Sequence, residues 1–334
     1  MDFSLLRSTL EASYCELGVT SEESQRITDS VLEAEISGVR THGLLRAAGY
    51  LDAFRDGSVP PVRIPLDVSE VTAAVVEVDG GGAFGHVPTW EAISRAIPMS
   101  RSHGVCIALI RNIRDFGRAA YYAQYAAERG QVAVVCQNTM PILAPPGGTA
   151  ATHGNNPLAF AVPGQAGPLF DAAWSPRAVG QLLLSQLEDV PLDPAWQFRA
   201  ADGAVTTDPA HALGVAQQPV AGHKGFGISV LVDVLAGVLT GSPSGPAVGS
   251  GRAVTGAFAL IISPEALGRS ATEMAETLSH TADAVRDAGG RWPGERASAA
   301  RARALESGTL ETSPAVFNLL NKASGGRMAT AFRA

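Results

Sequence analysis

Hydrophobic positions recur at helical spacing in the first part of the chain. Thr20 and Glu23 have the spacing of a capping box, in which Thr20 is the N-cap and the Glu23 side chain reaches back to it. Apolar residues follow at roughly helical spacing over residues 27–34. A second helical stretch is expected over residues 43–54, where an Asp-Gly pair soon stops it. This part of the chain therefore predicts helices.

Farther along, short β-branched segments alternate with helical ones. Strands are expected at residues 71–78, 105–110, 132–136, 158–162 and 258–262. Helices are expected at residues 89–102, 118–129, 228–239 and 264–287 and near Gln181, and the tail from residue 297 predicts a helix with a frayed end. Strands that alternate with helices favour an α/β fold, in which the two kinds of element pack in layers.

The composition and the charge narrow the class of protein. With 334 residues the chain can bury a large core and is expected to form two domains. Apolar residues make up 46% and charged residues 17%, which excludes wholesale disorder. A net charge of −7 argues against nucleic acid or an acidic membrane as a partner, because phosphate binding needs a basic surface.

Cysteine usage and the apolar runs indicate where the protein works. Cys15, Cys106 and Cys136 are widely spaced without a CxxC motif, and we interpret them as buried thiols of a reducing compartment. The longest strongly apolar stretches have about a dozen residues, which is too few to span a bilayer. No secretion signal precedes the polar start of the chain. We therefore expect a soluble cytoplasmic protein with no membrane partner.

Lysine is nearly absent, and one of the two lysines lies in a glycine-rich segment. The chain has 23 arginines, so an ammonium at Lys224 indicates that a compact point charge is preferred there over a planar guanidinium. The segment GHKGFG (222–227) precedes an apolar helix. Backbone N–H groups, the helix dipole and the lysine would then converge on an anionic ligand. The alternative is a solvated surface loop with an incidental lysine.

Polar residues near strand ends form a second group of candidates. Thr139 follows the strand at 132–136, where ligands bind in α/β sheets, and its hydroxyl could contact a phosphate or a ribose. Ordinary turn chemistry is the alternative. Asp171 directly follows an apolar strand, where it could cap a helix or could orient a catalytic histidine or a cofactor hydroxyl. The spacing alone leaves these alternatives open.

His42 and Arg46 form a third group. If their segment is helical, they lie at i and i+4 on one face. A histidine can transfer a proton near neutral pH, and an arginine can hold a carboxylate by two hydrogen bonds. Together they suit reduction at the carbon next to a carboxylate. The alternative is that both side chains are ordinary surface residues.

Several common signatures are absent from the sequence. The stretch Gly80-Gly81-Gly82 is not a GxGxxG fingerprint and no GxxxxGK[ST] occurs, so neither a Rossmann site nor a P-loop is predicted. The seven histidines are scattered without HExxH spacing, so no metal site is predicted. No GxSxG or paired Cys/His signature indicates nucleophilic hydrolysis.

Six motifs follow one another along the chain. They are GVRTHGLLR (38–46), HGNNPLAFAVP (153–163), LFDAA (169–173), TTDP (206–209), GHKGFG (222–227) and WPGER (292–296). Taken in this order, they resemble the malate/L-lactate dehydrogenase-like family of NAD(P)-dependent oxidoreductases. The resemblance covers nearly the whole chain. Members of the family include ureidoglycolate and sulfolactate dehydrogenases, 2,3-diketogulonate reductase and a reductase of the cyclic imine piperideine-2-carboxylate.

The resemblance implies a fold and an assembly. The expected fold is α/β and non-Rossmann, with a mixed-sheet cofactor domain and an all-helical domain formed from both chain ends. Residues 1–66 would form the N-terminal part of the helical domain and residues 67–225 the cofactor domain. Residues 226–334 would complete the helical domain and return one strand to the sheet. The family is typically dimeric with the site near the subunit contact, so we expect a homodimer that binds NADPH or NADH and a small carboxylate-bearing substrate.

The resemblance also implies roles for individual residues. His42 matches the proton donor or acceptor at the substrate, and Arg46 matches an arginine that binds the substrate carboxylate. Thr41 keeps the hydroxyl of the serine that is usual at its position. Asp171 matches an aspartate that lies beside both the cofactor and the catalytic histidine. The implied cofactor contacts are Thr139, Asp171, Ala172, Ala173, His223, Lys224, Gly294, Glu295 and Arg296.

The sequence departs from the family at one substrate-site position. Asp115, in RNIRDFG (111–117), stands where the family often has a histidine, to which some members assign proton transfer. An aspartate of ordinary pKa, about 3.9, is a poor acid at pH 7. Either His42 does the acid–base work, Asp115 has a raised pKa, or the substrate brings its own proton, as a protonated cyclic imine would. Pairing of Asp115 with Arg114 would instead make the position structural.

We therefore predict an NAD(P)H-dependent oxidoreductase that transfers hydride to or from C2 of a small 2-oxo acid, 2-hydroxy acid or cyclic 2-imino acid. Arg46 would hold the carboxylate, His42 would handle the proton and Asp171 would orient His42. Lys224 and the glycine loop would hold cofactor phosphate or ribose. The nicotinamide supplies the hydride chemistry. The change at Asp115 motivates one alternative, a cofactor-binding protein that has lost or repurposed catalysis.

Overall fold

A seven-stranded mixed sheet forms the centre of the molecule. The computed structural model describes residues 2–249 and 253–331. The sheet order is β1-β2-β3-β7-β4-β5-β6, and β2 pairs with β3 in parallel whereas the other neighbours are antiparallel. The strands are β1 (Asp67–Thr72), β2 (Val75–Asp79), β3 (Val105–Ile113), β4 (Val132–Gln137), β5 (Leu158–Ala161), β6 (Leu169–Ala172) and β7 (Thr255–Ile262). The predicted α/β class and mixed sheet are therefore confirmed.

Helices surround the sheet and fill both chain ends. Their bounds are α1 (Phe3–Cys15), α2 (Ser21–Ile36), α3 (Leu44–Arg55), α4 (His86–His103), α5 (Ala119–Ala127), α6 (Val179–Leu187), α7 (Pro209–Ala212), α8 (His223–Val232), α9 (Ala271–Asp287), α10 (Glu295–Ser307), α11 (Pro314–Ala323) and α12 (Met328–Ala331). A π-helical turn, η3 (Asp233–Val238), continues α8. Residues 332–334, the end of the expected frayed tail, lie outside the described residues.

Two predicted elements differ from the observed ones. The single strand expected at residues 71–78 is two strands, β1 and β2, because the Thr72 hydroxyl accepts a hydrogen bond from the Ala74 N–H and the chain turns there (3.2 Å). The helix expected over residues 264–287 begins only at Ala271, where Ser270 caps it by accepting from the Glu273 N–H. In both cases a hydroxyl side chain bonds the local backbone and interrupts the regular element.

The capping box at the start of α2 is half formed. Thr20 accepts a hydrogen bond from the Glu23 N–H, as predicted (3.2 Å). The Glu23 side chain does not reach back, because it is buried and accepts from the Val62 N–H instead (2.9 Å). Burial raises the pKa of Glu23 to about 7, against which the Val62 hydrogen bond works. A tertiary contact has thus replaced the expected local one.

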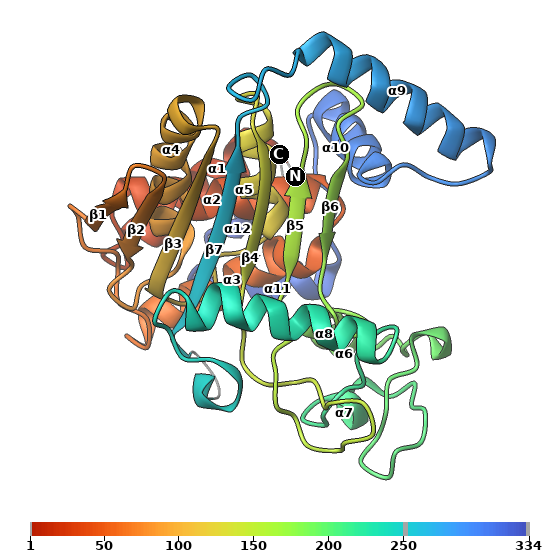
Figure 1. The fold of residues 1–334 in the computed structure, drawn as a ribbon. Helices are drawn as coiled ribbons and strands as arrows, with labels where there is room; N and C mark the ends of the chain where they lie inside the picture. The colour runs from red at the N-terminus through yellow and green to blue at the C-terminus, as the bar shows by residue number, and fades with distance from the viewer. Residues whose placement is uncertain (1, 250–252, 332–334) are drawn as a thin grey trace.

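The two faces of the sheet are covered differently. Helices α4 and α5 pack on one face and form a large buried cluster with the inward residues of the strands. On the other face, α8 and η3 cross the lower part of the sheet (Figure 1), and Val232 and Ala236 contact Cys136 and Phe258. Long strand residues on this second face, such as Ile107, remain partly exposed.

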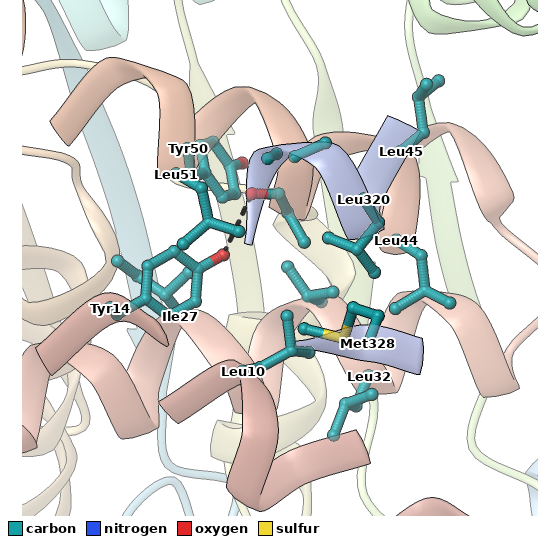
Figure 2. Packing of buried hydrophobic residues seen from close by; sticks show 14 of the residues in the cluster. Leu10, Tyr14, Ile27, Leu32, Leu44, Leu45, Tyr50, Leu51, Leu320 and Met328 are labelled. Carbon is teal, nitrogen blue, oxygen red and sulfur yellow. Dashed lines mark hydrogen bonds between the residues drawn. The ribbon is translucent and has the colours of Figure 1, made fainter. Parts of the chain in front are cut away.

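Both ends of the chain share one hydrophobic cluster. Helices α1, α2 and α3 pack with α11 and α12, and Leu10, Tyr14, Leu320 and Met328 meet in its interior (Figure 2). The Tyr14 hydroxyl donates to the Ala47 carbonyl, which ties α1 to α3 (3.3 Å). These helices hold α3 in place, and α3 carries Arg46.

Two smaller expectations can be settled from the coordinates. Cys106 and Cys136 are buried free thiols, but Cys15 is exposed, because it is the last residue of α1 and faces away from the cluster that α1 joins. Over the described ranges 2–249 and 253–331, no helix is both long and apolar enough to cross a membrane.

Candidate active site

A cavity of about 670 Å³ lies where the N-terminal helices meet the sheet, and most of the predicted site residues line it. Thr41, His42 and Arg46 come from the N-terminal segment, and Asp115 follows β3. Four more predicted residues line the cavity, namely Thr139, Asp171, Ala172 and Ala173. Segments that are far apart in the sequence therefore meet in one concave site, as ligand sites usually require.

His42 is placed by a short turn rather than by a helix. It ends a 3₁₀ turn (Arg40–His42), and α3 starts two residues later. The expectation that His42 and Arg46 share one helical face is therefore wrong, because Gly43 breaks the helix between them. A Cβ at Gly43 would lie 1.9 Å from Glu35 Oε2.

The buried Glu35 carboxylate explains that break. Its Oε2 accepts from the Leu44 N–H at the first turn of α3 (2.8 Å), where free N–H groups need an acceptor. Burial raises the pKa of Glu35 to about 7, although the Leu44 hydrogen bond opposes the rise. Glu35 thus fixes the turn that presents His42 and Arg46 to the cavity.

The His42 ring lies among four charged groups. Its Nδ1 is 3.0 Å from the Thr41 hydroxyl. Burial is the main reason that the pKa of His42 is lowered, and Arg46 and Arg118 lower it further, while Asp115 and Asp171 oppose the change. The lowered pKa therefore favours the neutral imidazole at pH 7.

Asp115 forms an ion pair with Arg46. Arg46 Nη2 lies 2.6 Å from Asp115 Oδ2, and the Gly117 N–H donates to Asp115 Oδ1 (2.9 Å). Burial alone would raise the pKa of Asp115, but Arg46 and the Gly117 N–H outweigh it and hold the pKa below its ordinary value. Asp115 is thus a carboxylate at neutral pH. Its neighbour Arg114 donates from Nε to the Gly82 carbonyl (2.9 Å).

Asp171 forms a second ion pair, with an arginine that the sequence did not indicate. It lies inside β6, so it caps no helix. Its Oδ2 accepts from Arg118 Nε (3.1 Å), and only 5% of the Arg118 side chain is exposed. Among the described residues no hydrogen bond joins Asp171 to His42. Nothing in the sequence distinguishes Arg118 from the other arginines, because its partner is 53 positions away.

Thr139 belongs to a polar turn after β4. Its hydroxyl donates to Asn155 Oδ1 (3.1 Å), and its N–H donates to Asn156 Oδ1 (2.9 Å). Asn156 is fully buried, and its amide also donates to the Ser229 carbonyl in α8 (2.8 Å). The turn is therefore built into the fold and is tied to the second half of α8.

The other predicted cofactor residues lie outside the cavity lining. His223 and Lys224 are exposed in the first turn of α8, whose N-cap is Gly222. Gly294, Glu295 and Arg296 start α10. Gly294 lies against the backbone of Leu169, at the far end of β6 from the cavity, and Glu295 Oε1 accepts from Arg286 Nε (2.6 Å).

Comparison with known proteins gives the chain a family. The family model described as malate/L-lactate dehydrogenase matches residues 1–321. The chain is 33% identical to L-sulfolactate dehydrogenase of Methanothermobacter thermautotrophicus over 70% of its length and 68% of that protein. It is 32% identical to Delta(1)-pyrroline-2-carboxylate reductase of Ancylobacter novellus, over 91% of this chain and 90% of that one.

The solved structures agree with this assignment. The crystal structure of delta1-piperideine-2-carboxylate reductase from Pseudomonas syringae superposes with a TM-score of 0.85 at 27% identity, covering 95% of this chain and 97% of that one. The chain thus shares its fold with this solved reductase. The chain belongs to the malate/L-lactate dehydrogenase family and is an NAD(P)-dependent oxidoreductase.

Proposed function

We propose that the protein reduces a cyclic 2-imino acid with NADPH or NADH. The observation that carries the proposal is the Arg46–Asp115 ion pair at the cavity wall. An arginine has five donors, so the pair leaves Arg46 donors for a substrate carboxylate. Asp115 then offers a carboxylate oxygen to a cationic N–H in the same substrate. A cyclic imino acid in its protonated form carries both groups.

A 2-oxo acid matches this arrangement less well. Its carboxylate could bind Arg46 in the same way, but its carbonyl oxygen, which carries no proton, would face the Asp115 carboxylate. The low pKa of Asp115, held down by Arg46 and the Gly117 N–H against burial, leaves no proton there to donate. Reduction of a ketone needs a proton on the oxygen, whereas an iminium ion accepts hydride without one.

The neutral state of His42 supports the same substrate class. Burial, Arg46 and Arg118 lower the pKa of His42, so little imidazolium is present at pH 7 to act as a proton donor. Two relatives that match more than nine-tenths of the chain bear names of imine reductases, from Ancylobacter novellus and Pseudomonas putida. Other relatives named as dehydrogenases of hydroxy acids match shorter segments.

The residues at hand suit a nicotinamide dinucleotide, which would supply the hydride. We assign Thr139, Asp171, Ala172 and Ala173 to the side of the cavity that receives the nicotinamide. The first turn of α8 offers free N–H groups and the Lys224 charge to phosphate. We assign His223, Gly294, Glu295 and Arg296 to the rest of the nucleotide. The helices from both chain ends would act as the domain that holds the substrate.

We also propose that the protein is a homodimer built on the open face of the sheet. Leu231, Val234, Val238 and Leu239 are 41–60% exposed on α8 and η3, and partly exposed strand residues continue the apolar surface. Contiguous exposed apolar surface of this kind marks interaction sites. In sedimentation velocity, Val234→Glu should give monomers, whereas Val205→Glu, at an equally exposed valine outside α8 and η3, should leave dimers. Dimers in both variants would move the interface elsewhere.

The substrate assignment is tested by a rate comparison. With NADPH and with NADH, the cyclic imines pyrroline-2-carboxylate and piperideine-2-carboxylate should give a kcat/KM at least 100-fold above that of pyruvate or oxaloacetate. Asp115→Asn should lower imine kcat/KM by roughly 10- to 100-fold, the value of a charged hydrogen bond. Asp79→Asn, in the Arg111 ion pair outside the cavity, is the matched control.

Two results would contradict the proposal. Higher kcat/KM for the oxo acids would overturn the substrate class while keeping the family chemistry. Tight binding of NADPH or NADH, measured by fluorescence, without turnover of any of these acids would favour the alternative that the protein binds the cofactor and has lost or repurposed catalysis.

A further inference from the structure

Arg118 is a buried charge beside the reacting groups that no role yet explains. Its side chain is 5% exposed, Nε donates to Asp171 Oδ2, and Nη1 has no hydrogen-bond partner in the described part of the chain. A buried guanidinium that is only partly satisfied costs free energy. Such a group is expected where its charge serves a purpose, and Arg118 lines the same cavity as His42.

The backbone before Arg118 is fixed by packing. Gly117 has φ +81°, and a Cβ there would lie 2.5 Å from Ser30 Oγ and 3.0 Å from His86 Nε2. The same glycine donates its N–H to Asp115. The short segment 115–118 therefore sends Asp115 toward Arg46 on α3 and Arg118 toward Asp171 on β6. Both ion pairs depend on one rigid turn.

Four charges face the His42 ring, two of each sign. Arg46 comes from α3, Asp115 and Arg118 come from the turn after β3, and Asp171 comes from β6. Each carboxylate has its own guanidinium, at 2.6 Å and 3.1 Å. The guanidinium groups therefore offset the two carboxylates, which by themselves would stabilise a positive charge on the imidazole.

We propose that Arg118 is a positioning residue that neutralises Asp171, keeps His42 uncharged and thereby favours imine over ketone substrates. The selection rests on the proposed function, since it presupposes that the cavity receives these substrates. When hydride adds to C2 of an iminium ion, the C=N π electrons move to nitrogen and cancel its charge, so no proton is required. When hydride adds to a ketone, the developing alkoxide takes a proton, which a charged His42 would give.

The electrostatic directions agree with this role. Burial is the largest cause of the lowered His42 pKa, and the Arg118 charge acts in the same direction while Asp171 acts against it. Removal of Arg118 would expose His42 to an uncompensated Asp171. The imidazolium should then persist to higher pH.

The test measures the protonation of His42 directly. NMR titration of the histidine rings, with the His42 signal identified by its loss in His42→Asn, gives its pKa without any activity. Arg118→Met should raise that pKa by about one unit, within the range that a neighbouring charge produces. Arg118→Lys, which keeps the charge, should restore most of the wild-type value. Arg111→Met, in an ion pair outside the cavity, should leave it unchanged.

A double-variant cycle tests whether Arg118 acts through Asp171. Adding Arg118→Met to Asp171→Asn should change the pKa of His42 much less than Arg118→Met does in the otherwise wild-type protein. The double variant also removes both charges of the pair, so it stays informative if the single variant does not fold. Arg118→Gln is a second neutral variant for the same purpose. An unchanged His42 titration in these variants overturns the proposal.

The rate measurements separate this inference from the proposed function. In Arg118→Met, oxo-acid kcat/KM at pH 7 should rise by up to about tenfold, in step with the imidazolium fraction, and imine kcat/KM should not. A shifted titration with an unchanged ratio of the two rates overturns the selective role of Arg118. A wild-type enzyme that prefers oxo acids overturns the proposed function, even where the titration result still supports the action of Arg118 on His42.

Discussion

The two ends of the proposed site are built on different principles. At the proposed substrate end, His42, Arg46 and Asp115 line the same cavity as Asp171, and both acidic groups are paired with arginines. At the nucleotide end, Lys224 is exposed and outside the cavity lining. The substrate end is thus preorganised within one chain. The nucleotide end offers solvated groups that gain their contacts when a ligand binds.

This difference sets the size of the effect expected from each substitution. Removing one member of a partly buried pair leaves the other charge without its partner, which costs more than the loss of an exposed charge. Removing an exposed charge loses one contact and leaves water in its place, which costs less. Substitutions at the substrate end should therefore change the rates more than those at the nucleotide end.

The largest loss is expected for Arg46→Met. It removes the group assigned to the substrate carboxylate and leaves Asp115 unpaired, so imine kcat/KM should fall about 1,000-fold. Steady-state kinetics with purified protein measures it. Adding Asp115→Asn to this variant should recover part of the loss, because the unpaired charge is gone. A loss below tenfold would mean that another residue binds the substrate carboxylate.

The next effect is expected for His42→Ala, and it should depend on the substrate. Oxo-acid turnover should fall roughly 100-fold, the usual contribution of general acid–base catalysis. Imine turnover should fall by less than about tenfold, because the iminium ion needs no proton from the enzyme. Equal losses with both substrates would mean that His42 transfers a proton in both reactions or in neither.

A smaller effect is expected for Lys224→Ala. The dissociation constant of NADPH should rise about tenfold, since one charged contact to phosphate is lost. Lys322→Ala is a matched control, because Lys322 is the other lysine of the chain and lies on α11. Fluorescence titration measures both. An unaltered constant in Lys224→Ala would remove this residue from the cofactor site.

The smallest effect on the rates is expected for Glu35→Gln, which should change stability instead. Burial raises the pKa of Glu35 from 4.5 to about 7. The contribution of Glu35 to the free energy of unfolding is therefore complete below pH 4.5. It falls by up to about 3 kcal/mol as the pH rises to 7. Glutamine keeps an acceptor for the Leu44 N–H but cannot ionise. Denaturant unfolding of Glu35→Gln should show a shallower fall between pH 4.5 and 7, whereas Glu22→Gln, at an exposed residue in the first turn of α2, should behave as wild type.

The sequence predicted the parts of the molecule that depend on local patterns. The alternating strands and helices follow from the spacing of apolar residues, and Thr20 caps α2 as its hydroxyl predicts. Residues at strand ends, such as Thr139, were expected at a ligand site and do line the cavity. These features require only neighbours in the chain or the known edge of a sheet.

The remainder depends on contacts between distant segments. No local pattern shows that Glu23 bonds the Val62 N–H, or that β7 lies between β3 and β4. The pairing of Arg46 with Asp115 joins residues from α3 and the turn after β3. Arg118 is the clearest example, because its ion pair depends on Asp171, which the β5–β6 hairpin brings next to it.

The rigid turn at Gly117 is a segment that could be transferred to another enzyme of the family. Five consecutive residues, 114–118, hold one member of each charge pair, and their backbone shape is dictated by Ser30 and His86 beneath them. Grafting this pentapeptide into a ketone-reducing homologue, together with the two underlying side chains, should carry the preference across as a cassette. Transferring Asp115 or Arg118 alone should instead give a homologue with lower activity.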